Sequence, residues 1–120
     1  YREVNGQWEM DPQVLRGSEL GGAFGSTLSI TPDGSTLAIG GPGNNDFGSG
    51  SGSIQVWSFN GVRWVQQGSS IGGSENTAYG SSVSVSADGQ RVVGGAPEAD
   101  YDGSVAETGH FRVYDRDESE

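Results

Sequence analysis

A stretch that occurs twice constrains the fold of this chain more than any other feature. Residues 24–42 read FGSTLSITPDGSTLAIGGP, and residues 79–97, which lie 55 positions later, read YGSSVSVSADGQRVVGGAP. Each stretch has an aromatic-Gly-Ser start, two apolar runs around an Asp-Gly turn, and a glycine-rich end closed by proline. A repeat of this length is typical of proteins that stack similar small units against one another.

Apolar and polar residues alternate within these runs, which is the period of a half-buried strand. The 22 glycines argue against helices, in whose interior glycine costs about 1 kcal/mol. Asn5-Gly6 and Asn60-Gly61 are hairpin signals, because both turn residues have to tolerate a positive φ. One strand and a linker are expected within 8–20. The repeats predict further strands at 26–31, 36–40, 53–59, 63–67, 82–86, 91–95 and 110–115.

Each repeat is expected to form four short antiparallel strands, and one such sheet cannot bury both of its faces. Four-stranded sheets stacked around an axis form a β-propeller, which typically has ~4–8 blades. We therefore predict an all-β fold with two four-stranded antiparallel blades of a β-propeller. The ring is incomplete in one chain and needs further copies or blades. The predicted boundaries are 1–7 for the end of a preceding blade strand, 8–61 for the first repeat, and 62–120 for the second repeat with its acidic C-terminal end.

Composition argues against several classes of function. The formal net charge is −10 and all six basic residues are Arg. Nucleic-acid-binding proteins carry a basic stripe, so no nucleic-acid partner is expected. No apolar run approaches the ~18 residues of a membrane-spanning helix, so no membrane insertion is expected. Because the chain has no Cys, it has neither a disulfide nor a thiolate metal site.

The repeated motif resembles a known family. Phe24-Gly25 with Gly40-Gly41-Pro42, and Tyr79-Gly80 with Gly95-Ala96-Pro97, are similar to the FG-GAP repeats of integrin α-subunit propellers. They resemble still more the short FG-GAP repeats of bacterial and algal secreted or surface proteins, whose W-x-Q-x-G element is matched from Trp64 to Gly68. The resemblance implies a propeller, a role in protein binding or cell adhesion, and an extracellular or cell-surface location.

Integrin-type repeats also carry a calcium loop of the form D-x-D-x-D-G. Only Asp33 and Asp88 stand in the corresponding places, so this metal site is not expected here. A separate candidate for Ca²⁺ is the acidic run Glu98, Asp100 and Asp102, whose alternating carboxylates precede Gly103. The other interpretation of this run is a solvated acidic loop. No other cofactor is expected.

The loops 43–53 and 98–109 are expected to contact a partner, because loops on a rigid scaffold carry recognition. The run 48–52, GSGSG, lacks the Lys of a phosphate-binding loop and is predicted to be flexible. The candidate contact residues are Asn44, Asn45, Asp46, Phe47, Tyr101 and Glu107.

Aromatic side chains either pack between blades or form a platform for carbohydrate. They are Trp8, Trp57, Trp64, Tyr79, Tyr101 and Tyr114. His110 is the only His, and no nucleophile motif accompanies it, so we expect a protein without enzymatic activity. The main prediction is a structural or binding module for protein–protein association or adhesion. The alternatives are a lectin-like propeller, a calcium-dependent adhesion module, and an accessory subunit of a larger complex.

Overall fold

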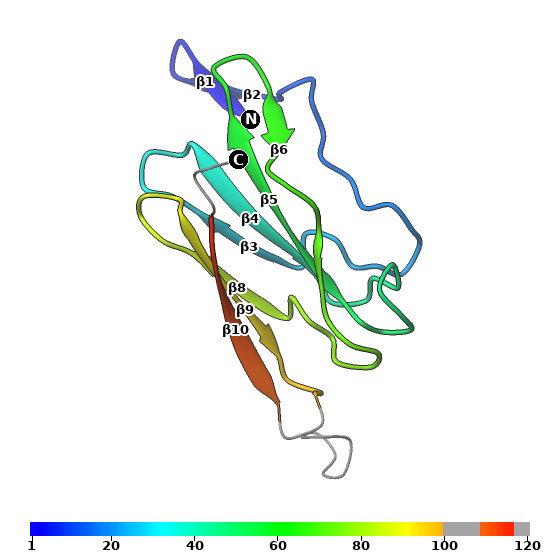
Figure 1. Ribbon diagram of the computed structural model, residues 1–120. Helices are drawn as coiled ribbons and strands as arrows, with labels where there is room; N and C mark the ends of the chain where they lie inside the picture. Colours follow the sequence, from blue (N-terminus) through cyan, green and yellow to red (C-terminus); the bar gives the residue numbers. More distant parts are fainter. Residues whose placement is uncertain (100–108, 117–120) are drawn as a thin grey trace.

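The computed structural model describes residues 1–99 and 109–116. All regular secondary structure in these residues is β-strand, in three antiparallel sheets (Figure 1). No helix that could cross a membrane is found among them. The prediction of an all-β, antiparallel fold is confirmed.

Sheet 1 is a meander in which each strand pairs with the next along the chain. Its strands are β3 (Thr27–Ile30), β4 (Thr36–Gly41), β5 (Ser53–Phe59) and β6 (Trp64–Gln66), and β7 (Ile71–Gly72) pairs with β5 as well. Sheet 2 repeats the meander with β8 (Ser82–Val85), β9 (Arg91–Ala96) and β10 (His110–Asp115). The third sheet is the hairpin of β1 (Arg2–Val4) and β2 (Gln7–Glu9).

The strand and linker expected within 8–20 agree with β2 and the stretch without a strand that follows it, which is interrupted by breakers such as Gly17 and Gly21. The structure differs from the prediction in two places. Sheet 2 has three strands among the described residues, because a counterpart of β6 would follow β10, where residues 117–120 are not described. The two-residue strand β7 was not predicted, because it is too short to show a period.

The Asp-Gly turns of the two repeats have the same hydrogen bonds. Asp33 Oδ1 accepts from Thr31 Oγ1 at 2.7 Å and from the Ser35 N–H at 3.0 Å. Asp88 Oδ1 accepts from Ser86 Oγ at 2.7 Å and from the Gln90 N–H at 3.0 Å. Both carboxylates therefore accept hydrogen bonds within their own turns.

Acid is expected to weaken the turn at Asp33. Hydrogen bonds from Ser35 and Thr31 lower the pKa of Asp33 to about 2 in the folded protein. The stabilisation is therefore complete above about pH 4, where the carboxyl of the unfolded chain is also ionised, and is lost as the pH falls toward 2. Urea unfolding of the wild type and of Asp33→Asn, which keeps an acceptor but does not titrate, measures this. We expect the wild type to lose stability relative to Asp33→Asn between pH 4 and pH 2. A difference between the two proteins that stays constant over this range contradicts the prediction.

The two Asn-Gly turns differ from each other. Asn5 and Gly6 both have positive φ, as the hairpin signal predicts. At the second turn only Gly61 has a positive φ. Asn60 instead accepts hydrogen bonds through its Oδ1 from the N–H groups of Val62 and Arg63, both at 2.9 Å. The predicted hairpin forms there, but the positive φ expected at Asn60 is wrong, because the asparagine side chain caps a four-residue connection between Phe59 and Trp64.

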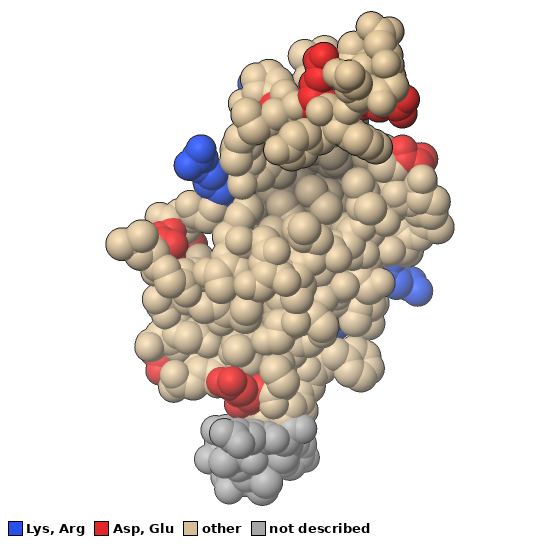
Figure 2. Space-filling view, turned by 180° about the vertical axis from the view of Figure 1, so that it is seen from behind, with Lys and Arg blue, Asp and Glu red and all other residues tan. Residues whose placement is uncertain are grey.

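Sheet 2 packs beside sheet 1, and the β1–β2 hairpin lies above sheet 1 in the view of Figure 1. A side chain ties the segment that leads from β2 to β3 onto β6. Gln13 Nε2 donates to the Trp64 carbonyl at 2.9 Å, and Gln13 Oε1 accepts from the Trp64 N–H at 2.7 Å. Seen from behind, the middle of the molecule is uncharged, and acidic and basic side chains are spread around its outline (Figure 2).

Candidate functional site

Cross-strand register decides which side chains share a face, because directly paired residues of an antiparallel ladder point to the same side. In sheet 1 one face, which we call the β3 face, carries Leu28, Ile30, Leu37, Ile39, Gln55 and Trp57. The opposite face, the inner face of sheet 1, carries Thr27, Ser29, Ala38, Gly40, Ile54 and Val56.

The same register places the faces of sheet 2. Its inner face carries Val83, Val85, Val92, Gly94, Arg112 and Tyr114. Its other face, which we call the β10 face, carries Ser82, Ser84, Val93, Gly95, Phe111 and Val113. By repeat position the inner face of sheet 2 is the equivalent of the β3 face, and the β10 face is the equivalent of the inner face of sheet 1.

The two inner faces pack against each other and form the core. Its buried members are Ala38, Ile54, Tyr79, Val92, Ala96 and Ala99, and Val56, Ile71, Val83, Val85 and Tyr114 pack against them. Ile54 is fully buried, and a Cβ added at Gly94 would overlap its Cδ1 atom. Glycine at this position of sheet 2 therefore lets the sheets approach closely.

Hydrogen bonds join the two repeats at the edge where β3 meets β8. Thr27 Oγ1 donates to the Gly80 carbonyl at 2.7 Å, and the Val85 N–H donates to Ser29 Oγ at 3.0 Å. Small hydroxyl side chains on the inner face of sheet 1 thus bind backbone groups of the second repeat. The inter-sheet contact is polar at this edge and apolar in its middle.

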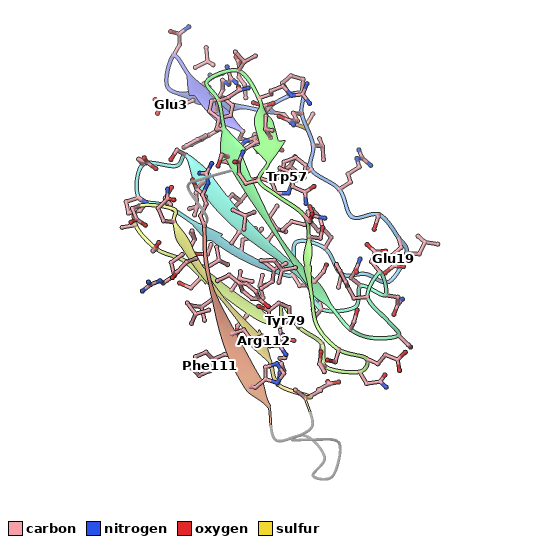
Figure 3. The ribbon with its side chains drawn as sticks, in the orientation of Figure 1. Glu3, Glu19, Trp57, Tyr79, Phe111 and Arg112 are labelled. Carbon is pink, nitrogen blue, oxygen red and sulfur yellow. The ribbon has the colours of Figure 1, made fainter. Side chains whose placement is uncertain are left out.

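Tyr79 is the aromatic residue that opens the second repeated motif, and it lies between the two sheets (Figure 3). Only 1% of the residue is exposed, and its N–H donates to the Ser51 carbonyl at 3.0 Å. Burial, followed by the nearby Tyr114, raises the pKa of the Tyr79 phenol above its ordinary value. The interpretation of Tyr79 as an aromatic that packs between repeats agrees with this position, while its equivalent Phe24 is only half-buried.

The β3 face is open at residues whose equivalents in sheet 2 are covered. Leu28 and Ile30 are 61% and 56% exposed. Their equivalents Val83 and Val85 are partly buried against the core. In the second repeat the side chains at these positions pack against sheet 1. In the first repeat no sheet among the described residues covers the equivalent side chains.

The β10 face is open in the same way. Phe111 pairs with Gly95 as Ile54 pairs with Gly40, and Val113 pairs with Val93 as Val56 pairs with Ala38. Phe111 is 69% exposed and Val113 is 49% exposed. Phe111 projects from β10 away from sheet 1 (Figure 3). Among the described residues, both faces therefore present exposed apolar side chains, although Ile39 on the β3 face is only 2% exposed. The two faces occupy the repeat positions of the two faces that form the core.

A cavity of about 450 Å³ opens between the sheets on the side of β5 and β10. Val56, Ser58, Gln90 and Tyr114 are among its lining residues. The side-chain oxygen of Gln90 is buried and accepts no hydrogen bond from a described residue. The sheets are therefore in contact at β3 and β8 and where Ile54 of β5 meets Gly94 of β9, and they separate toward Val56, Ser58 and Tyr114, so that they enclose a wedge.

The predicted contact loop 43–53 is more ordered internally than its composition indicated. Asn44 is buried, and its amide donates to Asp46 Oδ2 at 3.3 Å. Asn45 Oδ1 accepts from the Gly50 N–H at 2.7 Å, and Ser51 is fully buried. Asp46 and Phe47 are exposed, and the Phe47 ring lies over Gly72. The flexible loop expected from the GSGSG run is instead held by hydrogen bonds, which glycine spacing alone does not reveal.

The predicted calcium ligands are only partly within the described residues. Glu98 is exposed, while Asp100 and Asp102 lie outside the described residues, as do the predicted contact residues Tyr101 and Glu107. In the described part of the chain no group of three or more His, Asp or Glu is placed to hold a metal ion. The calcium site stays a prediction.

The remaining aromatics and the histidine lie on β2, β5, β6 and β10. Trp8 is largely exposed on β2, and Trp64 is half-buried with its ring centroid 5.5 Å from that of Phe59. The Trp57 Nε1–H donates to Gln55 Oε1 at 2.9 Å on the β3 face. His110 is exposed on β10.

The sequence placed Leu28, Ile30, Phe111 and Val113 in strands without assigning these residues individually to an exposed face. The signal that could have found them is their repeat position, since outward-facing equivalents of core residues are expected at the ends of a stack. No known protein-family model matches this sequence, and no curated protein matches it either.

Proposed function

We propose that this protein is a non-enzymatic association module that consists of two consecutive blades of an FG-GAP-like β-propeller. Its β3 face and β10 face bind further β-sheets of the same kind, in protein–protein association or adhesion. The observation that carries the proposal is the equivalence between the exposed pair Phe111 and Val113 and the core pair Ile54 and Val56. The positions that form the inter-sheet contact in sheet 1 carry apolar side chains in sheet 2 as well, and there they are exposed.

Physical chemistry supports a binding role for these faces. Burial of a Leu, Ile, Val or Phe side chain contributes about 1.5–3 kcal/mol each, so an uncovered row of them favours association. In repeat proteins stability is roughly a sum over units and their nearest-neighbour contacts, so a further sheet on either face adds one such contact. The uncovered faces are also the places where a terminal unit of a stack normally has polar residues.

A tandem protein tests the proposal without requiring tight binding between separate molecules. Two full-length chains are joined by a flexible Gly/Ser linker, which brings the β10 face of the first near the β3 face of the second. At high dilution we expect the tandem to melt about 5 °C or more above the single chain, because a new inter-sheet contact forms. Thermal unfolding followed by circular dichroism measures this.

The controls are two glutamate variants of the tandem. Ile30→Glu in both halves places a charge on the β3 face and should abolish the gain in melting temperature. Val62→Glu, in the exposed β5–β6 connection, adds the same charge away from both faces and should keep the gain. A tandem that melts at the temperature of the single chain overturns the proposed function.

A further inference from the structure

The two uncovered faces are different from each other, and their differences match those of the two faces that form the core. In the core, one side provides hydroxyls at Thr27 and Ser29, and the other provides the Gly80 carbonyl and the Val85 N–H. The β10 face carries Ser82 and Ser84 at the positions of Thr27 and Ser29. The hydroxyl-bearing side of the contact is therefore present on the β10 face.

The β3 face provides the matching backbone groups. Gly25 is the equivalent of Gly80, and their φ angles are +90° and +92°. The Gly25 N–H donates to the Gly40 carbonyl at 3.0 Å, and the Gly80 N–H donates to the Gly95 carbonyl at 3.0 Å. The backbone at Gly25 thus has the same local geometry as the backbone that receives Thr27 in the core.

We propose that a second copy of this chain docks its β10 face on the β3 face of the first, in a head-to-tail arrangement that repeats the inter-sheet contact between molecules. The proposal rests on the proposed function and adds to it the partner and the direction of binding. The occupant is a second copy because the internal contact between repeats joins the equivalents of these two surfaces. Phe111 and Val113 of one copy then lie against Leu28 and Ile30 of the next.

One position makes the contact between copies looser than the contact within a chain. Ile39 occupies on the β3 face the place of Gly94 on the inner face of sheet 2. Ile39 is larger than Gly94 and is only 2% exposed in its own chain, so Phe111 cannot pack there as Ile54 packs on Gly94, and the copies cannot approach at that point as closely as the sheets do. The angle between copies consequently differs from the angle between sheets.

The arrangement has two further consequences. A head-to-tail contact leaves one free face at each end, so copies add until a ring closes or a chain grows, rather than stopping at a symmetric dimer. Each copy carries a formal net charge of −10, so neighbouring copies repel one another at low ionic strength. We therefore expect assemblies larger than a dimer that are favoured at about 0.5 M salt, where charges are screened within a few ångströms.

A mixing experiment tests the direction of binding. Ile30→Glu blocks the β3 face and Val113→Glu blocks the β10 face, and both residues are about half exposed in the free protein. Size-exclusion chromatography with light scattering is carried out on the wild type, on each variant alone and on their equimolar mixture. We expect each variant alone to be monomeric, with self-association weakened about 100-fold or more, because a buried unpaired charge opposes docking. The mixture should form a one-to-one heterodimer, since each variant retains the face that the other lacks.

Each other result overturns the proposal. If Ile30→Glu alone still dimerises, β10 faces pair with each other. If Val113→Glu alone still dimerises, β3 faces pair with each other. A wild type that stays monomeric at about 0.1 mM in high salt overturns docking between separate copies, and a tandem that is still stabilised would then show that the two faces bind further sheets only when these are linked in one chain. If either variant unfolds, Leu28→Glu and Phe111→Glu form a second pair on the same two faces.

Discussion

Replacing Ile54 by alanine is expected to lower the free energy of unfolding by about 2–5 kcal/mol. Ile54 is fully buried in the contact between the sheets, and its Cδ1 atom lies against Gly94. The shortened side chain leaves a cavity that two rigid sheets cannot easily fill. Both the lost burial of the removed methyl and methylene groups and the cavity therefore contribute to the loss of stability. Urea unfolding at low protein concentration measures the change.

Phe111→Ala is the matched control, because Phe111 occupies the same position of sheet 2. Its side chain is 69% exposed, so its removal should change the free energy of unfolding of the dilute protein by about 0.5 kcal/mol or less. A comparable loss in the two variants would contradict the assignment of the inner and outer faces. Ile54 and Phe111 occupy the same repeat position, so the difference between their two losses of stability tests which of the two faces is buried.

Gly52→Ala is expected to destabilise the protein by roughly 2–5 kcal/mol. Gly52 has φ +72°, and an added Cβ would overlap the backbone oxygen and nitrogen of Tyr79. The two residues form a parallel bridge that joins the end of the 43–53 loop to the start of the second repeated motif. Backbone atoms at a strand junction cannot move aside as a flexible side chain can, so the clash is costly in addition to the left-handed conformation. Thermal and urea unfolding measure the loss.

Gly68→Ala separates these two causes. Gly68 has φ +69°, close to that of Gly52, but an added Cβ meets nothing within 4 Å. Only the conformational cost of about 1–2 kcal/mol is expected there. If the two alanine variants are equally stable, the close approach of Gly52 to Tyr79 does not contribute to the fold.

The repeated motif made the strands predictable. Alternation of apolar residues placed β3, β4, β8 and β9 within one or two residues of their observed ends. It could do so because Asp33 and Asp88 fix both turns through the same local hydrogen bonds, which depend on neighbours in sequence. Local chemistry of this kind is readable without a structure.

Contacts between distant residues were not predictable in the same way. Nothing in the sequence indicates that Gln13 binds the backbone of Trp64, 51 positions away, or that Ser51 is buried. The exposed state of Leu28 could not be read from its type either, since Val83 has the same pattern and is covered. Burial in a stack depends on which neighbours are present, and a local pattern does not contain that information.

The wedge between the two sheets has a geometric consequence. Sheets that touch at β3 and β8 and part toward Val56, Ser58 and Tyr114 are tilted relative to each other, so a stack continued with the same tilt must curve. In such a stack the centre of curvature would lie on the side of β3 and β8. Val56 and Tyr114 line the wider side, so a change in the size of either side chain is expected to change the tilt between the sheets.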